Sequence, residues 1–300
     1  MDKIINIAVV AHVDVGKSTL VDALLSQCGM LDKELNTHQI MDSNELEKER
    51  GITIYSKNCS VRYKDYKINI VDTPGHADFS SEVERIIKTV DTVILMVDSK
   101  EGVMPQTRFV LEKALRQNLN PILFINKIDK KDARVDEVVN MTFDLFVELG
   151  ANLKQLDFPI CYGIAKQGIA KLELDDESDN IFPLLDTVIN NTEMLSGDES
   201  DPVRMQISSL EYDDYLGRLG VGRVSCGLLK LGSNVVISKN NGELVSSKVN
   251  KIFVNEGIKK KEVKEARFGE IVIVQTYEKI EVGDTICDPN NVEPFPPIEI

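Results

Sequence analysis

Residues 11–18, Ala-His-Val-Asp-Val-Gly-Lys-Ser, most constrain the fold because they separate two runs of different hydrophobic period. Residues 4–11 are apolar and β-branched except for Asn6, which predicts a buried strand. Residues 19–27 carry apolar side chains at helical spacing, which predicts an amphipathic helix. A strand, a glycine-containing turn and a helix in this order are typical of a phosphate-binding α/β fold.

The turn matches the Walker A pattern, G-x-x-x-x-G-K-[ST], at every position except the first, where Ala11 replaces glycine. Gly16 allows backbone N–H groups to close around a phosphate at the positive end of the helix. Lys17 is expected to reach the β- and γ-phosphates, and the Ser18 hydroxyl to bind Mg²⁺. The alternative is a turn that contains Gly-Lys-Ser by chance.

A second motif, residues 72–76 with the sequence Asp-Thr-Pro-Gly-His, follows an expected strand at 68–71. A carboxylate at the end of a buried strand can hold Mg²⁺ through water, which is the role we expect of Asp72. The N–H of Gly75 has no side chain in its way and is expected to contact a terminal phosphate. Taken alone, Asp72 is an ordinary turn residue.

A third motif, Asn-Lys-Ile-Asp at residues 126–129, follows an apolar run at 121–125 and resembles the guanine-reading motif of GTPases. The carboxylate of Asp129 can accept hydrogen bonds from N1–H and the 2-amino group of guanine, and adenine lacks both donors. An unpaired buried carboxylate would therefore disfavour adenine. The alternative is a charged loop after a strand.

Residues 50–54, Arg-Gly-Ile-Thr-Ile, lie between the first two motifs. Thr53 is expected to give Mg²⁺ a second hydroxyl when a γ-phosphate is present, which would order this segment in the triphosphate state. Alone, Thr53 is typical of a strand edge. The order of all four motifs is what makes the set specific.

Together these motifs resemble the translational GTPases, which act on the ribosome. Residues 41–50, 103–109 and 156–160 resemble the BipA/TypA family within that group. The resemblance implies a GTP-hydrolysing switch in ribosome assembly or in translation under stress and cold, with rRNA and ribosomal proteins as partners. Chains of this family are about twice as long, so we expect an N-terminal fragment.

The resemblance also implies roles for individual residues. His76 would orient the attacking water, with Lys17 and Asp14 as further catalytic residues and a monovalent cation near Asp14. Backbone groups from Val15 through Thr19 would bind the phosphates, although relatives carry histidine in place of Val15.

After the last expected strand this chain has Ile164-Ala165-Lys166, where the family carries a Ser-Ala-Leu-like loop, so the bracing serine hydroxyl is missing. The Ala165 N–H would still reach guanine O6, and Lys166 would lie along the base plane. The nucleotide-binding set expected from the family is therefore Asp14, Val15, Gly16, Lys17, Ser18, Thr19, Gly75, Asn126, Lys127, Asp129, Ala165 and Lys166.

The pattern predicts two domains in 300 residues. Residues 1–196 alternate buried strands with helices, which indicates a P-loop NTPase G domain with a mainly parallel sheet and helices on both faces. Residues 158–163 are its last expected strand, and Val139, Phe143 and Phe146 are expected to form a core stripe in a helix at 136–149.

The turn-forming and charged residues at 197–202 predict a linker. Residues 203–300 contain short runs of β-forming residues, which predict a small β-barrel. Asn241-Gly242 predicts a hairpin between two of these strands. Three glycines resemble those of the second domain of translational GTPases: Gly217, Gly220 and Gly222.

Composition indicates a globular protein, with 42% hydrophobic and 28% charged residues. Five scattered cysteines predict reduced, buried thiols in a cytoplasmic protein. We see no secretory signal and no membrane-spanning run, and expect a monomer that binds neither DNA nor membrane. The net charge of −14 predicts weak binding of RNA by this fragment, because phosphate neutralisation needs basic patches. The one compact basic run, 259–261, is better interpreted as a solvated edge.

Two other functions stay open at this point. The chain could be a nucleotide-gated binding module with negligible turnover, in which GTP only changes a surface. It could also be another P-loop enzyme, an ATPase or a small-molecule kinase, in which residues 126–129 match by accident.

Overall fold

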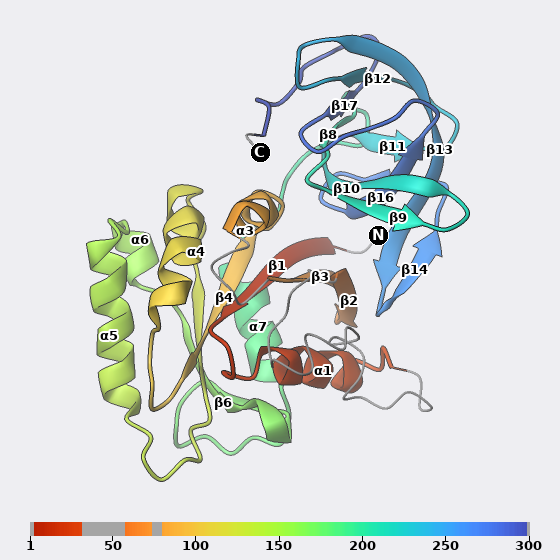
Figure 1. Ribbon diagram of the computed structural model, residues 1–300. Helices are drawn as coiled ribbons and strands as arrows, with labels where there is room; N and C mark the ends of the chain where they lie inside the picture. Colours follow the sequence, from red (N-terminus) through yellow and green to blue (C-terminus); the bar gives the residue numbers. More distant parts are fainter. Residues whose placement is uncertain (1–2, 32–57, 74–79, 299–300) are drawn as a thin grey trace. The chain divides into compact units, whose positions relative to one another are not determined.

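The computed structural model describes residues 3–31, 58–73 and 80–298, and it divides the chain into two compact units. The first comprises Met1–Glu193 and the second Met194–Ile300. Each is described by itself below, and both are drawn in Figure 1.

The first unit is built on a seven-stranded sheet with the strand order β2-β3-β1-β4-β5-β6-β7. Strands β3, β1, β4, β5 and β6 pair in parallel, whereas β2 and β7 are antiparallel edge strands. The central strands are almost wholly buried, as their continuous apolar sequences predict. The strands are β1 (Lys3–Ala11), β2 (Asn58–Tyr63), β3 (Tyr66–Asp72), β4 (Thr92–Asp98), β5 (Ile122–Asn126), β6 (Ile160–Ile164) and β7 (Ile169–Lys171).

Helices cover both faces of this sheet, with α1 and α7 on one side and α3, α4 and α5 on the other (Figure 1). Parallel strands joined by helical crossovers bring the carboxyl ends of β1, β4, β5 and β6 to one edge, where ligands of such sheets collect. The helices are α1 (Lys17–Gln27), α3 (Ser80–Ile87), α4 (Pro105–Arg116), α5 (Val135–Glu148), α6 (Leu153–Leu156) and α7 (Phe182–Asn191), with a short 3₁₀ turn at Ala165–Gln167.

Two local predictions for this unit are wrong. Helix α5 buries Val138, Thr142 and Phe146, whereas Phe143 is 41% exposed. Thr142 can take a place in the buried stripe because its hydroxyl donates to the Val138 carbonyl oxygen at 2.8 Å and is thereby satisfied. Strand β6 is also not the last of the sheet, since β7 follows it after a tight turn.

The second unit is a closed barrel with the strand order β12-β17-β8-β10-β16-β13, and β13 pairs back onto β12. Apolar side chains from these strands fill its interior. The barrel strands are β8 (Arg204–Gln206), β10 (Gly217–Cys226), β12 (Asn234–Ser238), β13 (Leu244–Glu256), β16 (Ile271–Thr276) and β17 (Thr285–Cys287). Outside the ring lie β9 (Ser209–Asp213), β11 (Leu228–Lys230), β14 (Lys259–Glu262) and β15 (Glu265–Arg267).

The fold class predicted from the sequence is confirmed in both units. The hairpin expected at Asn241-Gly242 joins β12 to β13, with Gly242 at φ 87°. The lysines of β14 are exposed and pair with the end of β13, as an edge strand would. Within the described ranges no helix is long and apolar enough to cross a bilayer.

Gly222 allows β10 to lie close to β8 in the barrel wall. A Cβ at this position would sit 2.1 Å from the backbone oxygen of Gln206, which cannot move without breaking strand pairing. We predict that Gly222→Ala destabilises the second unit by about 1–3 kcal/mol, the usual cost of overpacking. Hydrogen exchange followed by mass spectrometry should report faster exchange in β8 and β10.

Gly197→Ala is the matched control, because its Cβ would lie at an ordinary 3.4 Å from the Phe268 ring. Exchange in β8 and β10 should not change in this variant. Equal protection of the barrel in both variants would contradict the close approach at Gly222.

Candidate functional site

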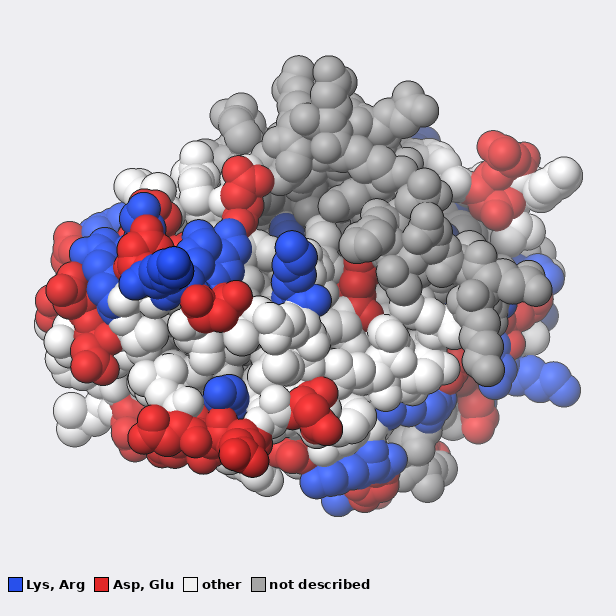
Figure 2. All heavy atoms as spheres, turned by 90° about the horizontal axis from the view of Figure 1, so that it is seen from below, with Lys and Arg blue, Asp and Glu red and all other residues white. Residues whose placement is uncertain are grey.

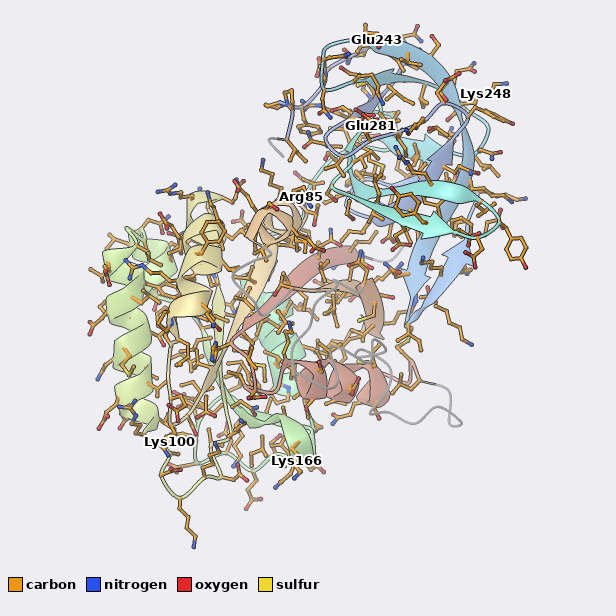
Figure 3. The ribbon with its side chains drawn as sticks, in the orientation of Figure 1. Arg85, Lys100, Lys166, Glu243, Lys248 and Glu281 are labelled. Carbon is orange, nitrogen blue, oxygen red and sulfur yellow. The ribbon has the colours of Figure 1, made fainter. Side chains whose placement is uncertain are left out.

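The candidate site lies at the carboxyl edge of the first sheet. The loops after β1, β4, β5 and β6 all leave the sheet there, and Figure 3 places Lys100, after β4, and Lys166, after β6, at this end. Figure 2 is the view from below this end. It shows one group of acidic side chains and, apart from it, a group in which basic and acidic side chains are mixed. The loops that carry the first and third sequence motifs therefore share one edge.

The turn before α1 forms a cradle of backbone. Gly16 adopts φ 109°, a conformation that disfavours any side chain, and a Cβ there would lie 2.7 Å from the Asn126 side-chain nitrogen. Among the residues the structure describes, no side chain caps the N-terminus of α1. The first N–H groups of an α-helix have no acceptor within the helix, and the helix dipole favours negative charge at this position.

Lys17 links this turn to the end of β3. Its side chain is buried, and its ammonium donates to the backbone oxygen of Thr73. The Thr73 hydroxyl in turn donates to the Val9 carbonyl oxygen at 2.6 Å. The Lys17 ammonium therefore stands beside the residue that follows Asp72.

Asn126 is the last residue of β5, and it is only 3% exposed. Its side chain connects the loop that follows β5 to the Walker turn and to the turn after β6. Its amide nitrogen donates to the Val15 carbonyl oxygen at 2.7 Å, and its amide oxygen accepts from the Ala165 N–H at 2.9 Å. Both polar ends of a buried amide are satisfied by this pair. The geometry therefore holds the Walker turn and the loop after β6 at fixed positions relative to residue 126.

Lys127 makes a second connection to the Walker turn. Its ammonium donates to the backbone oxygen of Asp14 at 2.7 Å. Lys127 at φ 63° and Asp14 at φ 65° both adopt the left-handed conformation, which is uncommon for residues other than glycine. Such conformations persist only where surrounding contacts enforce them, and they concentrate at functional sites.

The turn after β6 is held by backbone bonds and by one side chain from α1. Ala165 is buried and Lys166 is exposed. Gly168 ends the turn at φ 66°, and its carbonyl oxygen accepts from the Gln27 side chain at 2.8 Å. The Gln27 amide oxygen accepts from the Ile181 N–H at 2.8 Å, so this side chain ties α1 to both the turn and the start of α7.

Sequence reasoning missed Gln27, and no local signal could have revealed it. Its two partners are 141 and 154 residues away along the chain. A glutamine at the end of an amphipathic helix is ordinarily a solvated residue, and only the folded chain brings these partners together.

The remaining predicted residues are placed only in part. Ser18 is half-buried, Thr19 is exposed at the start of α1, and Asp129 is exposed in the loop after β5. The backbone of Asp72 ends β3, paired with Val9. Thr53, Gly75 and His76 lie outside the described residues. Within the described part of the chain, no three His, Cys, Asp or Glu side chains gather as a metal site.

Comparison with known proteins identifies both units. Residues 2–194 match the model of the elongation factor Tu GTP binding domain, and residues 217–287 match that of elongation factor Tu domain 2. A solved structure of translation elongation factor SelB from Methanococcus maripaludis, in complex with the GTP analogue GppNHp, has a TM-score of 0.70 at 23% identity. The match covers 97% of this chain and 56% of that one.

Curated relatives are more similar in sequence. The large ribosomal subunit assembly factor BipA of Bacillus subtilis is 49% identical, and the match covers 98% of this chain and 48% of the relative. The protein of the same name from Salmonella typhimurium is 46% identical over 98% of this chain and 49% of its own length. The chain thus spans about half the length of these relatives, and the resemblance to BipA is confirmed. Because the first family model matches more than half of its residues, the chain belongs to the family of the elongation factor Tu GTP-binding domain.

Proposed function

We propose that the chain binds GTP and GDP with Mg²⁺ and hydrolyses GTP as a switch that acts on the ribosome. The observation that carries this proposal is the Asn126 side chain, which bonds both to Val15 of the Walker turn and to Ala165. A phosphate-binding loop and a base-binding loop are thereby held together, as one nucleotide requires. Membership of the elongation factor Tu GTP-binding domain family supports the same conclusion.

The residues of the Walker turn fit a phosphate and a metal ion. The cradle has no room for a side chain at Gly16, and the start of α1 offers N–H groups to an anion. The Lys17 ammonium can exchange the Thr73 carbonyl oxygen for a phosphate oxygen. Ser18, Thr53 and Asp72 would hold Mg²⁺, which when bound neutralises charge on the phosphates.

Guanine is the base that the third motif favours. Asp129 is exposed and free to accept two hydrogen bonds from the guanine edge. The N–H of Ala165 donates to Asn126, which fixes the turn before a ligand arrives. While it keeps this bond it is not available to guanine O6, the contact expected from the sequence. The aliphatic parts of Lys127 and Lys166 would flank the base plane.

Hydrolysis of GTP requires positioning and charge stabilisation more than covalent chemistry. We assign His76 to orienting the attacking water and Gly75 to contacting the terminal phosphate through its N–H. Asp14, held in a left-handed turn by Lys127, would order the phosphates with a monovalent cation.

The curated relatives carry the name large ribosomal subunit assembly factor, which supports the ribosome as partner and the cytoplasm as location. The net charge of −14 supports weak rRNA binding by this part alone. The other half of the relatives' length would then supply most of the affinity.

Base selection provides the first test of this function. Calorimetry should detect GTP and GDP binding and about 100-fold weaker ATP binding, because bound adenine would cover the exposed Asp129 carboxylate without offering it a hydrogen-bond donor. Asp129→Asn should weaken GTP binding by about 10- to 100-fold and favour xanthosine nucleotides, since an amide can donate to the second xanthine carbonyl.

Asp132→Asn is a matched control in the same loop, because Asp132 pairs with Lys100 at the surface. This variant should keep the preference for GTP. Equal affinity of the unaltered chain for ATP and GTP would instead favour an ATPase or a small-molecule kinase.

The second test concerns His76. We predict that His76→Ala slows ribosome-stimulated phosphate release by about 100-fold or more, because a group that orients the attacking water contributes on this scale. GTP affinity should change by less than about twofold, since the side chain acts in the transition state. Phosphate release is measured with and without ribosomes.

Unchanged turnover in the His76 variant would remove this residue from the mechanism. Release that stays negligible in the unaltered chain, even with ribosomes, would instead favour a nucleotide-gated binding module.

A further inference from the structure

Asp98 is a buried carboxylate that none of the proposed nucleotide contacts uses. It is the last residue of β4 and pairs in the sheet with Asn126 at the end of β5. Its side chain is 7% exposed. A buried charge is costly unless partners compensate it, so its surroundings indicate what it does.

Both oxygens of this carboxylate have partners. One accepts from the backbone N–H groups of Lys100 and Glu101 at 2.8 and 3.1 Å. The other lies 3.3 Å from the Lys127 ammonium and 3.4 Å from the Lys130 ammonium. The carboxylate is therefore fixed by its own loop on one side and faces two cations on the other.

Asp98 is ionised at neutral pH. Burial by itself raises the pKa of this carboxyl group, but the two backbone N–H groups and the Lys127 ammonium outweigh it, so the pKa lies below its ordinary value. A full negative charge is thus available to attract the lysines of the guanine loop.

Ser99, the residue after Asp98, holds the backbone of residues 126 and 127 from a second direction. The Ser99 hydroxyl donates to the Lys127 carbonyl oxygen at 2.7 Å, and the Ser99 N–H donates to the Asn126 carbonyl oxygen at 3.0 Å. These bonds help to enforce the left-handed conformation of Lys127. The end of β4 therefore braces both the backbone and the ammonium of residue 127.

We propose that Asp98 is a positioning residue for guanosine nucleotides, whose carboxylate holds the Lys127 ammonium against the Asp14 carbonyl oxygen. The Walker turn and the guanine loop are then aligned before a ligand binds, which reduces the ordering cost of binding. Without this charge, the ammoniums of Lys127 and Lys130 would repel each other and the link to Asp14 would loosen. This inference rests on the proposed function, because it concerns the same site.

The test is nucleotide affinity of Asp98→Asn, which keeps the shape of the side chain and removes its charge. Calorimetry on the 300-residue chain should give about tenfold weaker binding of both GDP and GTP, since both carry the base and phosphates that meet these loops. Asp132→Asn, an exposed carboxylate that pairs with Lys100, should bind as the unaltered chain does.

A double-mutant cycle separates positioning from damage to the fold. In a Lys127→Ala background, Asp98→Asn should cost less than about twofold, because the cation through which Asp98 acts is gone. If Asp98→Asn still weakened nucleotide binding about tenfold in the Lys127→Ala background, the proposal would be overturned. Asp98→Glu, which keeps the charge, should lose less affinity than Asp98→Asn. If the asparagine variant does not fold, Asp98→Glu serves as the test, and a loss of about tenfold or more in its GDP affinity would overturn the proposal.

The outcomes for the unaltered chain are distinct. If it fails to bind GDP, the proposed function is wrong and the role of Asp98 falls with it. If it binds GDP and Asp98→Asn binds equally well, only the role of Asp98 is wrong.

Discussion

The arrangement of the candidate site depends on the Asn126 side chain. A primary amide offers donors at one end and an acceptor at the other, and here each end meets the backbone of a different loop. Because the amide is buried, the loss of either partner would leave an unsatisfied polar group, which costs about 1–3 kcal/mol. The two loops are therefore coupled through this residue before any ligand is present.

The close fit around Asn126 also explains the glycine of the Walker turn. The side-chain nitrogen that bonds to Val15 occupies the space that a Cβ on Gly16 would need. Glycine is thus required at position 16 for two reasons: the backbone is left-handed, and the Asn126 side chain lies where a Cβ would be. The phosphate cradle and the guanine loop are parts of one packed structure.

Much of the fold can be predicted from the sequence because its strongest signals are local. The buried strands β1, β4 and β5 are apolar runs, and the first and third motifs lie at the ends of β1 and β5. The short strand β7 and the fully exposed β14 lack such a pattern, because three or four residues at an edge need no apolar alternation. The exposed Phe143 shows that helical spacing alone does not decide which of two adjacent stripes is buried.

Only those site residues that belong to a recognisable sequence motif can be predicted from the sequence. Gln27 and Asp98 belong to no motif, and their partners come from distant segments. The roles of Thr53, Gly75 and His76 rest on resemblance, since these residues lie outside the part of the chain that the structure describes. Long-range hydrogen bonds and ion pairs are therefore what the folded chain adds to the sequence.

The most direct measurement of the central claim is a crystal structure of this chain with Mg²⁺ and a non-hydrolysable GTP analogue. The account predicts phosphates at the N-terminus of α1, the guanine edge at Asp129, and an unbroken Asn126 bridge between Val15 and Ala165. An analogue bound elsewhere, or a bridge that opens to admit it, would contradict the claim that these loops form one preassembled nucleotide site.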